Sequence, residues 1–384
     1  MADKKSKNVF RLGLTSLFTD ISSEMIFPIL PIFLTAVLNA PIAIIGLIEG
    51  IAESAASLLK LASGRISDKI GKKKPLVIGG YSLSTITKPL LALATHWTHV
   101  LGVRFFDRVG KGIRDAPRDA LLAGSVEKKK RGGGFGLHRA MDTAGAIIGT
   151  LIAFFLLQRY LGEAYKLIFW LSFIPGLIAV LILVFGVKDV KVKVAKKLKV
   201  SFRKNSPLLN RFLFVIAFFN LANFSYAFFI LRARDVGLFL ALIPIIYLVY
   251  NLFYAFFAIP IGKLSDAVGR RIILFSGLLL FGLTSLGFAF TADTTTIWIL
   301  FALYGIFMAA TDGVSRAYVS DLSIKEKRGT ALGAYHMIVG ITVLPANFIG
   351  GLLWDNINVQ APFIYAAVLS IISAVLLLIL IRKK

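Results

Sequence analysis

The chain has 384 residues, of which 57% are apolar and only 17% are charged. Soluble globular proteins carry about 45–50% apolar and about 25% charged residues. The apolar excess rules out a soluble or disordered protein and predicts that lipid surrounds most of the chain. The formal net charge is +24 and cysteine is absent, which excludes disulfides and thiolate metal sites.

Apolar runs of membrane-spanning length recur along the whole chain. A helix needs about 20 such residues to cross the hydrocarbon layer, and about twelve runs meet this criterion. They cover residues 10–37, 41–62, 75–95, 98–122, 133–157, 164–186, 211–234, 238–261, 272–291, 295–318, 330–353 and 361–381. The sequence therefore predicts an all-α integral membrane protein with about twelve transmembrane helices.

The basic residues indicate how these spans are oriented. Lys and Arg cluster after every even-numbered span, and the odd-numbered exits carry few. Because cytoplasmic loops carry the excess of positive charge, we expect both termini on the cytoplasmic side of the cell membrane. The net charge is thereby explained without nucleic acid, which is not an expected partner.

The longest basic linker divides the chain into two halves. It covers residues 187–210 and separates a predicted six-helix bundle over 1–186 from a second one over 211–384.

The two halves also share sequence motifs. GRISDKIGKKK begins at Gly64 and GKLSDAVGRR at Gly262, 198 residues later, while EKKKRGGGFG at 127–136 matches IKEKRGTALG at 324–333, 197 residues later. A nearly constant offset between two separate matches indicates duplication, and parallel repeats are a known transporter design.

The two loops share G-x-x-S-D-x-x-G followed by basic residues. They resemble the G-x-x-x-D-[RK]-x-G-[RK]-[RK] signature of the major facilitator superfamily of secondary transporters, which the first loop matches in full and the second more weakly. The resemblance covers the whole chain, and it implies two pseudo-symmetric bundles and a cytoplasmic gate at these loops. Gly64 and Gly262 are expected to permit close helix approach, and Gly71 and Gly269 a tight turn. The expected gating residues are Gly64, Asp68, Lys69, Gly71, Lys72, Gly262, Asp266, Gly269 and Arg270.

Ionisable residues within predicted spans are costly, and they are treated as functional by default. Asp20 and Glu24 lie four residues apart on one helix face. Pro28 and Pro31 follow in FPILPIF, which resembles the first span of drug:proton antiporters, and these prolines should bend the outer half of the helix. The residues expected to couple to protons are Asp20, Glu24, Asp107 and Asp142.

The fourth span is unusually charged. Its segment RFFDRVGKGIRDAPRDALLAG, residues 104–124, resembles the superfamily pattern R-F-x-Q-G-x-G-x-G, which is tied to proton coupling. Asp107, Arg108 and Lys111 replace neutral residues of that pattern. The arginines form one drifting stripe, which must face a water-filled cavity or acidic partners and not lipid.

Further polar residues complete the expected substrate site. The candidates for substrate contact are Arg104, Arg108, Arg114, Arg118, His138, Arg139, Asn220, Asn223 and Tyr226. The last three recur at helical spacing within an aromatic second half. A closed ion-pair network with a purely structural role is the alternative, and it applies best to Glu49, Glu53, Lys60 and Lys88.

We therefore predict a monomeric, proton-coupled transporter of a small amphiphilic organic solute, with anionic solutes among the candidates. Export is favoured by the antiporter-like first span, although GAIIGTLIA at 145–153 matches the antiporter motif G-x-x-x-G-P-x-x-G only in part. An alternative cargo is a metal ion or metal chelate, with Asp20, Glu24, His138 and Asp142 as ligands. A non-transporting receptor or a lipid scramblase is a third reading.

Enzymatic activity and a cofactor are not expected, because the sequence contains no P-loop, nucleotide-binding cassette signature or nucleophile constellation. The energy for transport is therefore expected to come from an ion gradient.

Overall fold

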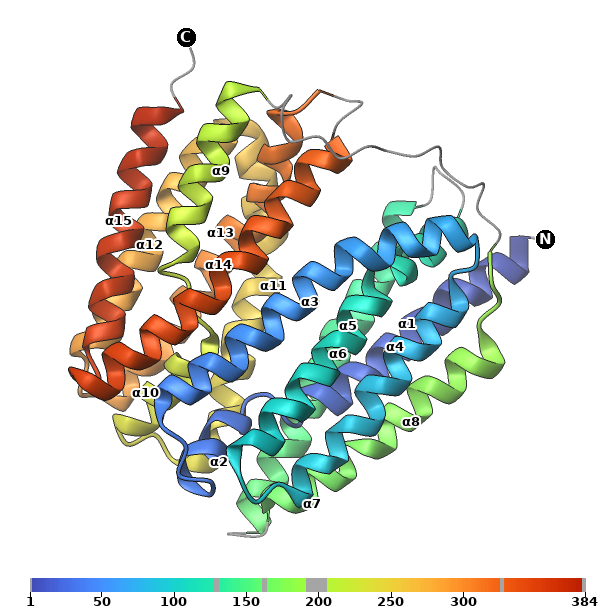
Figure 1. The fold of residues 1–384 in the computed structure, drawn as a ribbon, viewed down its shortest axis with the longest axis horizontal. Helices are drawn as coiled ribbons and strands as arrows, with labels where there is room; N and C mark the ends of the chain where they lie inside the picture. The colour runs from blue at the N-terminus through green and yellow to red at the C-terminus, as the bar shows by residue number, and fades with distance from the viewer. Residues whose placement is uncertain (1, 127–130, 161–163, 191–205, 325–327, 382–384) are drawn as a thin grey trace. The chain divides into compact units, whose positions relative to one another are not determined.

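The computed structural model describes residues 2–126, 131–160, 164–190, 206–324 and 328–381, and all of the figures below draw it. Within these ranges the regular elements are all helical (Figure 1). Most of the basic linker expected over 187–210 lies outside the described residues, as do several of the basic residues that predicted the orientation.

The helices divide into two compact units. Unit 1 comprises Met1–Asn39 and Ile51–Leu198, and unit 2 comprises Ala40–Gly50 and Lys199–Lys384. The start of the long helix α3 (Ile42–Ile70) thus belongs to unit 2 and its remainder to unit 1. The sequence did not indicate this division, because the apolar run of α3 continues through Gly50.

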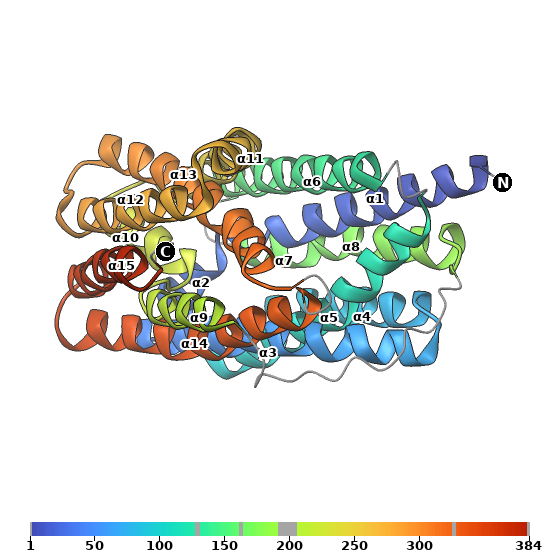
Figure 2. The same ribbon diagram turned by 90° about the horizontal axis from the view of Figure 1, so that it is seen from above.

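The remaining helices of unit 1 follow the expected spans closely. They are α1 (Ala2–Glu24), α2 (Leu30–Ala36), α4 (Lys74–Thr87) with the 3-10 segment η1 (Lys88–Leu93), α5 (Trp97–Gly124), α6 (Arg131–Arg159), α7 (Ala164–Leu171), α8 (Phe173–Leu181) and the π-helical turn η3 (Ile182–Gly186). In this unit α1 packs along α6, and α4 packs along α5 (Figure 2).

Unit 2 contains the other helices. They are α9 (Pro207–Asn220), α10 (Tyr226–Asp235), the 3-10 turn η5 (Leu240–Leu242), α11 (Ile243–Val268), α12 (Arg270–Phe290), α13 (Thr294–Asp321), α14 (Arg328–Asn356) and α15 (Ala361–Leu380). Its core is aromatic: the ring of Phe229 contacts those of Phe288 and Tyr304, and Phe281 contacts Phe307. Aromatic residues of the second half therefore pack against each other.

Nine helical segments within the described residues are long and apolar enough to cross a membrane. Three expected spans do not meet this criterion. The fourth, α5, is a continuous helix of sufficient length, but it carries charged side chains along most of it. The first is interrupted, and its long part α1 has 23 residues but carries charged side chains. The seventh is interrupted into two short helices of 14 and 10 residues.

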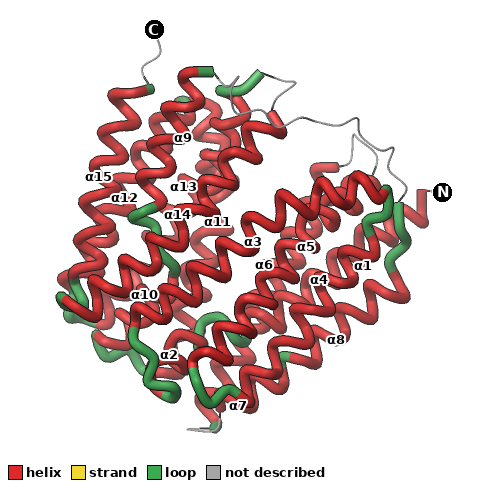
Figure 3. Tube along the Cα trace, viewed as in Figure 1, coloured by secondary structure: helices red, strands yellow, loops and turns green. Residues whose placement is uncertain are grey.

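Loop segments interrupt both spans (Figure 3), and the residue numbers of the two interruptions match. Helix α1 ends at Glu24 and α2 begins at Leu30, while α9 ends at Asn220 and α10 begins at Tyr226. Both pairs differ by 196 residues (220 − 24 and 226 − 30), close to the offsets of the repeated motifs. Interrupted helices in corresponding positions of two halves point to the binding region of a transporter.

Candidate functional site

Helix α5 is held between two neighbours in unit 1. A Cβ atom on Gly110 would lie 2.6 Å from the carbonyl oxygen of Gly80 on α4, and one on Gly112 would lie 2.8 Å from that of Ala56 on α3. The hydroxyl of Ser63 also donates to the carbonyl oxygen of Gly112 at 2.7 Å. Because both helix contacts are backbone contacts, they fix the rotation of α5 and the directions of its charged side chains.

The first charged residues of α5 pair with each other and with α3. Arg104 has only 2% of its surface exposed and lies 3.7 Å from the carboxylate of Asp107. Arg108 is also buried; it lies 3.2 Å from Glu53 and 4.0 Å from Asp107. The Phe27 ring contacts both guanidinium groups, at 4.9 and 4.7 Å. These predicted residues therefore meet acidic and aromatic partners, as a stripe that avoids lipid requires.

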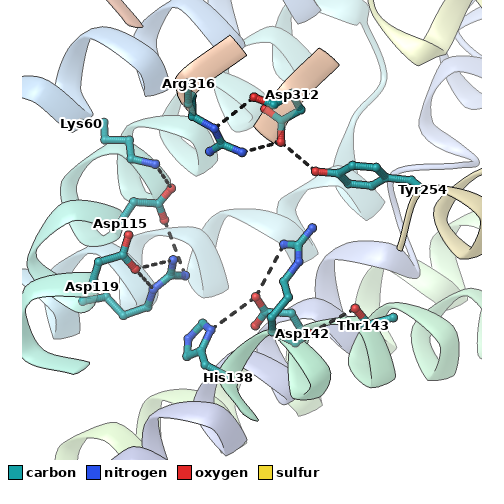
Figure 4. A network of polar contacts seen from close by, with 11 residues as sticks. Lys60, Asp115, Asp119, His138, Asp142, Thr143, Tyr254, Asp312 and Arg316 are labelled. Atoms are coloured by element: carbon teal, nitrogen blue, oxygen red, sulfur yellow. Dashed lines mark hydrogen bonds and ion pairs between the residues drawn. The ribbon is translucent and has the colours of Figure 1, made fainter. Parts of the chain in front are cut away.

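The later charged residues of α5 form a second set of contacts. Arg114 donates to the hydroxyl of Ser84 at 2.7 Å and stacks 4.3 Å from the ring of Tyr81. Arg118 interacts with Asp115 at 3.8 Å and with Asp119 at 2.9 Å, and Lys60 reaches Asp115 at 3.6 Å (Figure 4). Lys60 takes part in internal pairing, as the structural alternative expected.

Helix α1 lies directly against the glycines of α6. A Cβ atom on Gly145 would be 3.1 Å from the Cβ of Asp20, and one on Gly149 would be 3.0 Å from the Cα of Ile21. Asp20 lies close enough to Asp142 of α6, to Glu24 of its own helix, and to Lys111 and Arg114 of α5 for their charges to act on it. Asp20 is therefore surrounded by charges of both signs.

The predicted residues of α6 converge on one carboxylate. His138 Nδ1 lies 3.4 Å and Arg139 Nη1 3.9 Å from Oδ2 of Asp142 (Figure 4). The side chain of Ser16 on α1 also hydrogen-bonds the Asp142 carboxylate. In the described part of the chain, His138 Nε2 is buried and makes no hydrogen bond, so one ring nitrogen keeps unused hydrogen-bonding capacity inside unit 1.

Within the described ranges, no three His, Asp or Glu side chains gather closely enough to hold a metal ion. The ligand set expected for the alternative cargo, Asp20, Glu24, His138 and Asp142, is therefore not assembled as a metal centre among these residues.

Lys88 is a buried charge that the sequence assigned to internal pairing. Its Nζ donates to the hydroxyls of Ser22 at 3.0 Å and Ser23 at 2.8 Å, at the end of α1, and Asp107 attracts it electrostatically. It thereby connects the interruption of span 1 to the charged helix α5.

The polar residues of span 7 lie at the interruption between α9 and α10. Asn220, 8% exposed, ends α9, Asn223 lies within the interruption, and Tyr226 begins α10, where its ring lies 5.1 Å from that of Tyr247. The expectation that these three share the face of one continuous helix is wrong. The backbone N–H of Ser225 donates to Asn347 Oδ1 of α14 at 2.8 Å and so holds the interruption in place.

The loops expected to form the gate contain the turns that the sequence predicted. Gly71 and Gly269 have φ angles of 72° and 100°, which L side chains rarely adopt,. A Cβ atom on Gly64 would make ordinary contact with Ala116 at 3.4 Å, but one on Gly262 would meet open space, so close helix approach does not explain Gly262.

The structure shows ion pairs for the charged residues of the second loop, but it describes those of the first loop only in part. Arg270 pairs with Asp266 at 2.9 Å and also with Asp321 at the end of α13. Lys69 and Lys72 are exposed, and the side chain of Asp68 is outside the described part of the structure.

These features define a multi-pass membrane protein of the transporter class, with ionisable side chains buried among its helices. The sequence model of the Major Facilitator Superfamily matches residues 12–246 and 212–384. The chain belongs to this superfamily.

The proteins similar to this chain resemble it over most of its sequence, over a short part of its sequence, or in the fold alone. An uncharacterised transporter of the superfamily from Methanocaldococcus jannaschii is 44% identical over 385 residues, which cover 97% of this chain and 94% of that protein. A class C tetracycline resistance protein from Escherichia coli is 38% identical over 113 residues, covering 29% of this chain and 27% of that protein. A nucleoside transporter structure has a TM-score of 0.83 at 14% identity and covers 97% of this chain and 100% of its own, which shows the fold alone.

Proposed function

We propose that this protein is a secondary active transporter that couples the export of a small amphiphilic organic solute to proton entry by alternating access. The observation that carries this proposal is the set of ionisable side chains on α1, α5 and α6, centred on Asp20. Ionisable groups inside the helices of a membrane protein mark an ion or substrate pathway.

Asp20 is the proposed proton carrier. It interacts with the carboxylates of Asp142 and Glu24, and repulsion between neighbouring carboxylates favours the state in which one of them holds a proton. Lys111 and Arg114 oppose that tendency. Proton binding at Asp20 would therefore change the balance between α1 and the cations of α5, which links protonation to the position of α1.

The solute is proposed to have a charged head and an apolar body. Arg108 is the best placed cation for an anionic head, because its partner Glu53 keeps 37% of its side chain exposed while Arg108 itself is buried. An anionic head would replace Glu53 at the guanidinium. The ring of Phe27, 4.7 Å from the Arg108 guanidinium in the same unit, would suit the apolar body,.

Export is proposed on two grounds. The first span ends in the antiporter-like segment FPILPIF, and one relative is a tetracycline resistance protein.

The ion pairs of Arg270 with Asp266 and Asp321 are proposed to act in the cytoplasmic gate, because they tie the turn between α11 and α12 to the end of α13. We propose a monomer in the cell membrane, with both termini cytoplasmic.

The decisive experiment compares Asp20→Asn with the wild-type protein in proteoliposomes that contain a pH-sensitive dye. A panel of lipophilic anions, lipophilic cations and metal chelates is added under a pH gradient. We expect one class to drive proton flux in the wild type and none to do so in Asp20→Asn, while Asp293→Asn, at an exposed carboxylate that precedes α13, behaves as the wild type.

Three results would count against the proposal. Full coupled flux in Asp20→Asn would remove Asp20 from coupling. Flux driven only by metal chelates would favour the alternative cargo, and the absence of flux with every compound would oppose proton coupling to these solutes.

A further inference from the structure

A second charged group lies within the helices of unit 2. Asp312 of α13 accepts a hydrogen bond from the Tyr254 hydroxyl of α11 at 2.7 Å and one from Arg316 Nη2 at 2.5 Å (Figure 4). Tyr335 of α14 lies near this pair, and its hydroxyl hydrogen-bonds the side chain of Ser315. Three helices therefore meet at one carboxylate–guanidinium pair.

The internal repeat supplies a matching group in unit 1. Asp312 follows Asp115 by 197 residues (312 − 115), the offset of the EKKKR and IKEKR segments. Asp115 is likewise bound by a residue of a neighbouring helix, Lys60, and by a guanidinium one turn further on, Arg118. Both groups thus contain an aspartate, an arginine one helical turn later, and a bound side chain from a neighbouring helix.

They differ in exposure. The side chain of Asp115 is 12% exposed, whereas those of Asp312 and Arg316 are 33% and 44% exposed. The Asp115 carboxylate of unit 1 is therefore largely covered, whereas the Asp312–Arg316 pair of unit 2 is accessible.

The accessible pair lies well inside its helix. Asp312 precedes the end of α13 at Asp321 by nine residues (321 − 312), or about 14 Å at about 1.5 Å per residue. Helix α13 has 28 residues, or about 42 Å, and so exceeds a hydrocarbon layer about 30 Å thick. A layer centred on the helix would place Asp312 about 8 Å inside its edge. An exposed ion pair at this depth must face water or a ligand and not acyl chains.

The pair also retains hydrogen-bonding capacity. Both side-chain bonds to Asp312 fall on Oδ2, and Arg316 uses Nε and Nη2 for Asp312 itself. Among the residues that the structure describes, no hydrogen bond is made to Asp312 Oδ1 or by Arg316 Nη1. One acceptor and one donor of opposite charge thus remain available on neighbouring side chains.

We propose that Asp312 and Arg316 form a recognition site for a neutral amide-like group of the transported solute, one that offers an N–H and a C=O side by side. The N–H would donate to Asp312 Oδ1, and the C=O would accept from Arg316 Nη1. A neutral group fits because the pair has no net charge, so a bare anion or cation would leave one partner opposed by a like charge. This inference rests on the proposed transport function and adds a second feature to its solute.

The absence of native cysteine allows a direct binding test. Gly313 is exposed next to the pair, and a Cβ atom there would meet no atom within 4 Å, so Gly313→Cys should fold normally. A thiol reacts with maleimide as the thiolate, which requires access to water. We expect a water-soluble maleimide to label Gly313→Cys readily and to label Leu283→Cys, on an exposed apolar position of α12, much more slowly.

Three probes share an aromatic body and differ in the head. They are N-acetyl-phenylalaninamide, which is neutral, phenylacetate, which is anionic, and phenethylammonium, which is cationic. At saturating concentration we expect the amide to slow labelling of Gly313→Cys about tenfold, and the two charged probes to have little effect. The double variant Asp312→Asn, Arg316→Gln in the Gly313→Cys background should lose this protection while it elutes as a single species on size exclusion.

Each other outcome opposes the proposal. Protection by phenylacetate or phenethylammonium alone would show a site for a charged head, and protection that survives in the double variant would place the amide elsewhere. If none of the probes slows the labelling, the Asp312–Arg316 pair does not bind an amide group of this kind. Because the assay measures binding, these results are independent of the proton flux that tests Asp20.

Discussion

The ammonium group of Lys88 donates a hydrogen bond to the hydroxyl of Ser23 at 2.8 Å. Ser23 lies next to the last residue of α1, and Lys88 begins the 3-10 segment that follows α4. The contact therefore joins the interruption of span 1 to the point where the third span changes from α-helix to 3-10 helix. A buried charge at such a junction is stabilised only when its partners stay in position.

The first prediction concerns this buried lysine. Lys88→Met keeps the length and apolar stem of the side chain but removes both hydrogen bonds, so we expect a loss of about 1–3 kcal/mol in the free energy of unfolding. Thermal unfolding in detergent would measure it, with Lys166→Met, at an exposed position of α7, as the control. A more stable Lys88→Met protein would mean that the cost of burying the charge exceeds the value of its bonds.

The second prediction concerns the packing of α1 on α6. A methyl group on Gly149 would meet the backbone of Ile21, whereas one on Gly136 of the same helix would meet nothing within 4 Å. Gly149→Ala should destabilise the protein by about 1–3 kcal/mol. Gly136→Ala should be neutral or stabilising by up to about 1 kcal/mol, because alanine favours helix.

Chemical unfolding of both variants in the same detergent gives this comparison. Equal effects at the two positions would show that α1 and α6 do not pack as closely as the structure has them.

The third prediction concerns the start of α3. The carboxylate of Asp355, near the end of α14, accepts hydrogen bonds from the backbone N–H groups of Ile42 at 3.1 Å and Ala43 at 2.7 Å. Asp355→Ala should therefore cost about 1 kcal/mol, as the loss of a helix cap does. Asn356→Ala, at the next residue, should cost less, and hydrogen exchange at residues 42–46 would locate the effect.

The structure of this region explains why the cap matters. A Cβ atom on Gly351 would lie 2.8 Å from the backbone nitrogen of Ala43, and one on Gly50 would lie 2.9 Å from the Cα of Leu344. The first part of α3 and α14 are thus in backbone contact within unit 2. Unchanged exchange in Asp355→Ala would mean that this packing alone holds the start of α3.

The fourth prediction concerns pH. Asp293 precedes α13, and hydrogen bonds from the backbone N–H groups of Thr296 and Thr295 and from the Thr296 hydroxyl lower its pKa below the ordinary value. A carboxyl group whose pKa is lowered by folding stabilises the folded state at pH values above its unfolded pKa, and that contribution is lost as the pH falls through the folded pKa.

Asp293→Asn should therefore remove part of the loss of stability below about pH 4, while retaining a cap at neutral pH. Unfolding midpoints measured from pH 3 to pH 7 would test this. An identical acid dependence in Asp293→Asn and the wild type would assign that dependence to other carboxyl groups.

Much of the fold follows from local sequence patterns. Apolar runs of sufficient length predicted the helices, because a bilayer requires every backbone polar group to be satisfied within its own segment. Pro28 and Pro31 predicted the bend in the first span, since proline removes a backbone donor. The interruption of span 7 was not predicted, because it depends on Asn347, which lies 122 residues from Ser225.

The candidate site was only partly predictable. The sequence selected the arginines of span 4 because charges at helical spacing inside an apolar segment are visible without a structure. It did not assign Asp312 and Arg316 a role, because they form a single pair on an otherwise apolar helix. Only their contact with Tyr254 and their exposure distinguish them from the closed group around Asp115.

The sequence by itself determined that this is a membrane protein of many helices, that it contains a repeat, and which charged residues must avoid lipid. These properties depend on composition, spacing and periodicity, which are local. The tertiary structure decided which charges meet, where two spans are interrupted, and which repeat-related ion pair stays open. Those outcomes depend on contacts between residues far apart in the chain, such as Gly149 with Ile21 and Asp312 with Tyr254, because the energy of a buried charge is set by the atoms that surround it.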